Sequence, residues 1–160
     1  FLILQTDDNG ERARVTGWGL GFGNAAQLVR TEAKCVRTAA QEEEAIRSLW
    51  CELDPQRYDG TTLYTWNRGT IDILRTGLLM SEIETPSLRG LRHVSLGDSI
   101  EEFFLSTNHD AITEIDSDFP IRHEGQWDFD RVDELIERLW NIRVQIGCLL
   151  PVEEIRGQPL

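Results

Sequence analysis

The opening of the chain has the alternation of a β-hairpin. Phe1–Thr6 is an apolar run with strand propensity, and the Asn9-Gly10 pair that follows favours a tight hairpin turn. Arg12–Phe22 continues as a second strand. Glycine stands at every second position from 17 to 23, so one face of this strand is bare backbone and the large side chains lie on the other. A glycine face of this kind predicts a bulge or the close approach of another backbone.

Further along, apolar positions recur with the period of helices. The segment Glu42–Leu53 follows a capping Thr38 and carries an apolar stripe, and Asp128–Ile146 has the strongest such stripe in the chain. Between them the pattern predicts shorter elements and one long polar surface excursion. These are strands Gln27–Val36, Thr61–Trp66 and Leu91–Leu96, helices Ile71–Met80 and Asp98–Phe104, and the excursion Leu105–Gln126.

Taken in order, the elements are three antiparallel strands, then helix, strand, helix, strand and helix. This order predicts a single α/β domain over residues 1–150, with a mixed β-sheet flanked by helices, and an irregular tail over residues 151–160. The chain begins at Phe1 rather than Met, so we expect it to be part of a longer protein. The side chains expected in the core are Ile3, Ile46, Trp50, Leu63, Leu135 and Leu139.

Charge narrows the choice of partners. The 160 residues carry a formal net charge of −12, and Lys34 is the only lysine. Such a chain repels the phosphate backbone at long range, so a broad basic binding face is not expected. The acidic, lysine-poor composition fits a high-salt cytoplasm, where charges are screened, and equally an acidic mesophilic protein with arginine-biased codons.

The cysteines and apolar runs bear on location. Cys35, Cys51 and Cys148 have no metal-ligand spacing and are interpreted as small buried side chains in a reducing compartment, which predicts a cytoplasmic protein. The apolar runs are far shorter than the roughly 20 residues of a membrane span. No membrane partner is therefore expected. Other protein subunits or domains are the expected partners.

Three stretches of the chain resemble the ribonuclease H-like 3′–5′ exonucleases of the four-acid (DEDD) class, which include the proofreading domain of family B polymerases. Glu42–Trp50 is similar to the helix before the second acidic motif. Leu63–Asp72 is similar to that motif, in which Asn ends a strand and an aromatic-Asp pair opens the next helix. Phe129–Asp133 resembles the third motif, a Tyr followed four residues later by Asp.

The resemblance implies a ribonuclease H-like fold and a metal-dependent nuclease site. Asp7, Asp72 and Asp133 would then be the catalytic residues and the ligands of Mg²⁺ or Mn²⁺. Asn67 and Trp66 would contact a single-stranded nucleic acid substrate. No organic cofactor is implied.

The sequence departs from the family pattern at the residues that matter most for hydrolysis. Gln5 stands at the position of the first motif's Asp, and Asp7 at that of its Glu. Ile71 replaces the aromatic residue of the second motif, and Phe129 lacks the hydroxyl of the third motif's Tyr. Two-metal hydrolysis needs carboxylates that bridge ions about 3.5–4 Å apart, whereas Gln offers one neutral oxygen. These changes predict an eroded metal site with weak or no hydrolysis.

Each candidate residue also has a structural interpretation. Asp72 suits the positive end of a helix, Asn67 and Asp7 suit turns, and Asp133 suits an exposed helix surface. Trp66 can stack on bases or pack in the core. Outside the motifs, Asp98 is expected to cap a helix.

Three functions remain open at this point. The first is a ribonuclease H-like domain with an eroded metal site that handles nucleic acid within a larger protein. The second is a non-catalytic structural or interaction module on the same fold. The third is an active, unorthodox metal-dependent nuclease that recruits other acids, such as Asp8, Asp98 or Asp116.

Overall fold

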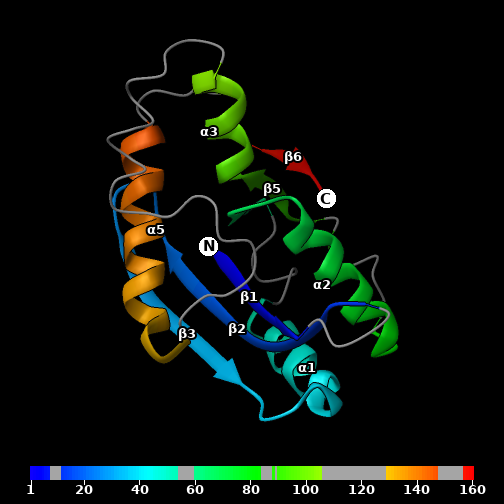
Figure 1. The fold of residues 1–160 in the computed structure, drawn as a ribbon. Helices are drawn as coiled ribbons and strands as arrows, with labels where there is room; N and C mark the ends of the chain where they lie inside the picture. The colour runs from blue at the N-terminus through cyan, green and yellow to red at the C-terminus, as the bar shows by residue number, and fades with distance from the viewer. Residues whose placement is uncertain (8–11, 54–59, 84–87, 89, 106–128, 148–156) are drawn as a thin grey trace.

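The protein is described by a computed structural model over residues 1–7, 12–53, 60–83, 88, 90–105, 129–147 and 157–160 (Figure 1). The Asn9-Gly10 turn, nearly all of the predicted excursion 105–126 and the tail up to residue 156 lie outside these ranges. The described residues form an α/β arrangement, as the element order predicts.

The first sheet contains the three strands at the start of the chain. β1 (Leu2–Asp7), β2 (Arg14–Gly23) and β3 (Leu28–Cys35) pair antiparallel in the order β1-β2-β3. The register shifts between Gln5 and Thr6, where the pairing of β1 with β2 contains a bulge. The predicted antiparallel opening of the sheet is confirmed.

A second sheet holds the remaining strands. β4 (Thr62–Thr65) runs parallel to β5 (Arg92–Ser95), and β6 (Gln158–Pro159) pairs antiparallel with β5. The expectation of one mixed sheet is therefore wrong, as is that of a wholly irregular tail. The backbone bonds of the short β4 are made with β5, and its contact with β1 is through side chains.

Each of the two hydrophobic cores nevertheless contains residues from both sheets. Phe1 and Ile3 pack with Tyr64, and the rings of Phe1 and Tyr64 lie 6.5 Å apart. Leu2 and Leu4 pack with Leu63 on the opposite face. Since alternate residues of β1 meet alternate residues of β4 on both faces, the two strands lie side by side as neighbours in one layer.

Helices α1 (Glu42–Leu53) and α2 (Gly69–Met80) cover one face of this layer. A 3₁₀ turn, η1 (Ala39–Gln41), leads into α1. The buried residues of α1 are Glu42, Ala45, Ile46, Leu49 and Leu53, which lie on one side of the helix. Trp50 lies at the edge of that stripe and is only partly buried, so its predicted core position is wrong.

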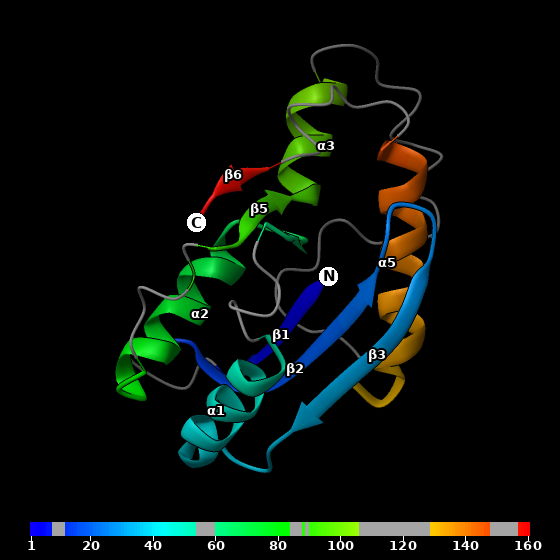
Figure 2. The same cartoon turned by 180° about the vertical axis from the view of Figure 1, so that it is seen from behind.

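The opposite face is covered by α3 (Leu96–Leu105) and α5 (Val132–Gly147), the latter preceded by the 3₁₀ turn η3 (Phe129–Arg131). In Figure 1, α5 lies in front of β2 and β3. In Figure 2, which shows the molecule from behind, α1 lies in front of the strand layer. Ile136 and Leu139 of α5 are fully buried, whereas Leu135 is only partly buried, contrary to expectation. Ile3, Ile46 and Leu63 are buried as predicted.

The glycine face of β2 is what allows α5 to lie so close. A Cβ added at Gly21 would stand 2.5 Å from Cγ2 of Ile136, and one at Gly19 would stand 2.7 Å from Cγ2 of Val132. Real side chains do not approach so closely, so the bare backbone of β2 is filled by the side chains of α5. The predicted bulge is present, since the register of β2 with β3 shifts between Phe22 and Gly23, but side chains rather than another backbone fill the face at Gly19 and Gly21.

One charged group is buried under the first turn of α1. Glu42 is 8 % exposed and receives hydrogen bonds from the Arg12 guanidinium at 2.5 and 2.9 Å and from the Val15 amide at 2.9 Å. Burial alone would raise the pKa of Glu42, but these bonds and the positive charges of Arg12 and Arg14 outweigh it and lower the pKa. Glu42 therefore joins α1 to β2 as a carboxylate.

Candidate functional site

Gln5, at the presumed position of the first acid, faces β3. Its Oε1 accepts a hydrogen bond from Sγ of Cys35 at 3.5 Å. It reaches Cys35 across Gly17, where an added Cβ would stand 2.9 Å from both the Gln5 Oε1 and the Cys35 Sγ. Asp7, at the end of β1, pairs with Arg14 in the ladder.

The space between β1 and the first half of α5 is apolar. Around Gly19 the nearest side-chain atoms belong to Ile3, Val132 and Ile136. Ile3 and Ile136 are at most 2 % exposed. We call this set of packed side chains, Ile3, Gly19, Val132 and Ile136, the β1–α5 seam.

Asp133 lies beside the seam but binds elsewhere. Its Oδ1 accepts a hydrogen bond from Oγ1 of Thr31 at 2.6 Å, which attaches the first turn of α5 to β3. The residue itself is exposed. Asp133 therefore holds a helix on a strand, and no carboxylate of β1 takes part in that contact.

Asp72 lies in a different part of the molecule. It is on the first turn of α2, its side chain is 73 % exposed, and its nearest cation is Arg75 at 3.8 Å. In the part of the chain that the structure describes, no three His, Cys, Asp or Glu side chains are grouped so that they could hold a metal ion. Asp7, Asp72 and Asp133 are all described, so they do not form such a group.

The residues present therefore do not fit a two-metal centre. Mg²⁺ and Mn²⁺ need several charged oxygens that converge on one point. The seam instead presents methyl groups at the place where α5 meets β1, and Gln5 is directed to Cys35. We derive no catalytic step through a metal ion.

The two predicted substrate contacts have structural partners. Oδ1 of Asn67 accepts hydrogen bonds from the amide and the hydroxyl of Thr70, at 3.0 and 2.9 Å, and so satisfies a free amide at the start of α2. Trp66 is 9 % exposed and packs on Gly97, where an added Cβ would stand 2.7 Å from the Trp66 carbonyl oxygen. Its ring belongs to the core cluster of α5 and α3.

Asp98 joins the ends of the two parallel strands. Its Oδ2 accepts hydrogen bonds from Oγ of Ser95 at 2.5 Å and from the amide of Arg68 at 3.0 Å. Ser95 immediately precedes α3 and Arg68 immediately precedes α2, so one carboxylate connects the starts of two helices. The predicted cap position is wrong, because α3 begins at Leu96 and Asp98 lies within its first turn. The contact with the start of α2 depends on how the strands pair.

His93 lies beside these residues and is held by a hydrogen bond with Thr65. Oγ1 of Thr65 donates its only proton to the Asn67 carbonyl at 2.7 Å, so it must accept from Nε2–H of His93 at 2.9 Å. In the neutral ring the proton is therefore on Nε2. Burial, and then the positive charges of Arg68 and Arg75, lower the pKa of His93, while Asp98 and Asp72 oppose this effect more weakly.

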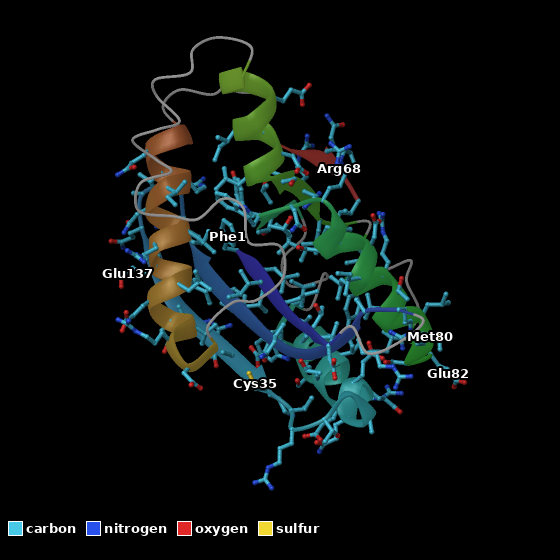
Figure 3. The ribbon with its side chains drawn as sticks, viewed as in Figure 1. Phe1, Cys35, Arg68, Met80, Glu82 and Glu137 are labelled. Atoms are coloured by element: carbon cyan, nitrogen blue, oxygen red, sulfur yellow. The ribbon has the colours of Figure 1, made fainter. Side chains whose placement is uncertain are left out.

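Arg68, His93, Ser95 and Asp98 line a cavity of about 490 Å³, which we call the α2–α3 cavity. Its walls come from the first turns of α2 and α3, from β5 and from the segment 157–160, and Arg68, labelled in Figure 3, is one of its lining residues. The ionisable residues that line it are Arg68, Asp72, Arg75, His93, Asp98 and Glu102. Neither Asp7 nor Asp133 lines it.

A second cavity, of about 420 Å³, is mainly apolar and lies at the other end of the sheet layer. Phe1, Phe22, Tyr64 and Trp140 are among its lining residues. Arg143 also lines it, with its guanidinium 5.0 Å from the Tyr64 ring centre and donating to the Ala25 carbonyl at 2.9 Å. The guanidinium of Arg143 is thus already engaged by the protein.

The cysteines correct one further expectation. Cys35 and Cys51 are exposed free thiols rather than buried side chains, and Cys148 lies outside the described residues. Partial burial and the negative charge of Asp130 raise the pKa of Cys35. This thiol is therefore protonated at neutral pH and is a poor nucleophile.

Comparison with protein-family models, with curated proteins and with solved structures finds no match for this chain. Among the described residues no helix is long and apolar enough to cross a membrane.

Proposed function

We propose that this chain is a ribonuclease H-like domain with an eroded metal site, which acts as a non-catalytic interaction module in nucleic-acid processing. The order of elements that resembles that fold supports the proposal. Three antiparallel strands are followed by α1, β4, α2, β5 and α3, with helices on both faces of the strand layer.

The observation that carries the proposal is the β1–α5 seam. A nuclease of the four-acid class needs carboxylates where its first strand meets its last helix. Here Ile3, Val132 and Ile136 close over Gly19, and Asp133 is bonded to Thr31. Because a packed methyl group cannot bind a cation, this arrangement favours the non-catalytic function over the unorthodox nuclease.

An exposed apolar pair supports an interaction role. Leu79 and Met80, at the end of α2, are 69 % and 61 % exposed, and Figure 3 labels Met80 on this edge of the molecule. The net charge of −12 disfavours direct binding of a nucleic acid backbone, which leaves other protein subunits or domains as the favoured partners.

The test is a nuclease assay on the purified chain. Labelled single-stranded DNA and RNA are incubated with Mg²⁺ or Mn²⁺, alongside Asp72→Ala and Asp133→Ala. We expect the wild-type chain to cleave no more than either variant, because its described residues form no metal site. Robust exonuclease activity that is lost in Asp72→Ala or Asp133→Ala would overturn the proposal in favour of an active nuclease.

A further inference from the structure

The α2–α3 cavity lies between two helices that pack on opposite faces of the strand layer. α2 packs with α1 through Ile71 and Leu74, whereas α3 packs on the opposite face through Leu96 and Ile100. These helices follow β4 and β5, which are adjacent and parallel. In open α/β sheets a crevice forms at the carboxyl ends of such strands, and ligands bind there.

The cavity brings two arginines, Arg68 and Arg75, together with three carboxylates, Asp72, Asp98 and Glu102. Arg68 makes no ion pair with any described carboxylate, and Arg75 has only the contact with Asp72 at 3.8 Å. Burial is the main cause that lowers the pKa of His93, and the charges of Arg68 and Arg75 lower it further than those of Asp98 and Asp72 raise it. The starts of α2 and α3 add their partial positive charges.

We propose that the α2–α3 cavity binds the phosphate group of a small phosphate monoester, with Arg68 and Arg75 as its cationic contacts. Guanidinium groups form paired, charge-assisted hydrogen bonds with phosphate oxygens. A volume of about 490 Å³ suits a small molecule. The overall charge of −12 disfavours a polyanion such as a nucleic acid strand.

The carboxylates of the cavity determine the rest of the ligand. Asp98 is occupied by Ser95 and the Arg68 amide, whereas Asp72 and Glu102 are exposed. Exposed carboxylates repel a second anionic group and accept hydrogen bonds from hydroxyls. The preferred ligand is therefore a polyol or sugar that carries a single phosphate.

The test is calorimetric titration at low ionic strength with ribose 5-phosphate, inorganic phosphate and a single-stranded oligonucleotide. We expect saturable binding of ribose 5-phosphate, weaker binding of inorganic phosphate, and no tighter binding of the oligonucleotide. Arg68→Gln and Arg75→Gln should each weaken binding about ten- to a hundredfold, the value of one charge-assisted hydrogen bond. Arg131→Gln, at an exposed arginine of η3 that is paired with Glu134, is the matched control and should change nothing.

A second readout places the ligand in the cavity. Bound phosphate near His93 stabilises its charged form, so the pKa of His93, followed by nuclear magnetic resonance, should rise on adding ribose 5-phosphate. The proposal is overturned if no probe binds saturably, if Arg131→Gln weakens binding as much as Arg68→Gln, or if the oligonucleotide binds most tightly through the same arginines. Thermal melts of each variant check that it folds.

Discussion

The β1–α5 seam and the α2–α3 cavity both lie where strands meet the start of a helix, yet they are built in opposite ways. In the seam, glycines on β2 admit Val132 and Ile136 so closely that methyl groups fill the space. At the ends of β4 and β5, the helices diverge and leave polar side chains around a cavity. The resemblance to nucleases directs attention to the first region, whereas the geometry favours a ligand in the second.

The largest expected effect on stability comes from truncating a buried side chain of the β1–α5 seam. Ile136 is fully buried, so Ile136→Ala should lower the free energy of unfolding by about 2–5 kcal/mol, as large-to-small core changes do. Urea denaturation measures the loss. Glu137→Ala, the exposed neighbour on α5, is the control and should cost less than about 0.5 kcal/mol.

A double-mutant cycle sharpens this test. Gly21→Ala alone should destabilise the protein, since its Cβ would stand 2.5 Å from Cγ2 of Ile136. In the Ile136→Ala background that atom is gone, so the cost of Gly21→Ala should fall. Equal costs in both backgrounds would show that α5 does not press on the glycine face.

The second-largest expected effect concerns the α2–α3 cavity. Asp98→Asn removes the charge that accepts hydrogen bonds from Ser95 and the Arg68 amide, and should cost about 1–2 kcal/mol after allowance for partial exposure. Asp72→Asn, a largely exposed acid in the same cavity, should leave stability unchanged within about 0.5 kcal/mol. Thermal melts compare the two variants, and a larger loss for Asp72→Asn contradicts the assignment of Asp98 as the connecting carboxylate.

The smallest effect is a dependence on pH. The folded state lowers the pKa of His93 from its ordinary value of 6.5, because of burial and the charges of Arg68 and Arg75, which Asp98 and Asp72 only partly offset. Unfolded chains then bind the proton more readily, so stability is fully present above pH 6.5 and declines as pH falls from 6.5 towards the lowered folded pKa. His93→Gln should flatten the profile of unfolding free energy in this window. A profile that keeps the wild-type slope points to another titrating group.

Local patterns predict much of the fold but little of the site. The helix Glu42–Leu53 has the predicted bounds because its apolar stripe is formed by neighbouring residues. The glycine face of β2 was also visible as a period of two. The burial of Glu42 was not, since its partner Arg12 is 30 residues away and only the packing of α1 on β2 brings the two together.

The α2–α3 cavity shows the same limit. Nothing local to Arg68 or His93 indicates that α2 and α3 depart to opposite faces of β4 and β5. Likewise, motif matching aligned Asp7, Asp72 and Asp133 along the chain, but the path of α5 over β2 and β3 attaches Asp133 to Thr31 instead. Residues that share a motif converge only if the backbone brings them together.

The most direct test of the central claim, that the seam has replaced a metal site, is calorimetric titration of wild type and Gln5→Asp with Mn²⁺. The account predicts no saturable uptake by wild type and no gain in Gln5→Asp, because a carboxylate there would face Gly17 and Cys35 rather than Asp72. Saturable Mn²⁺ uptake that strengthens in Gln5→Asp and is lost in Asp133→Asn would contradict it.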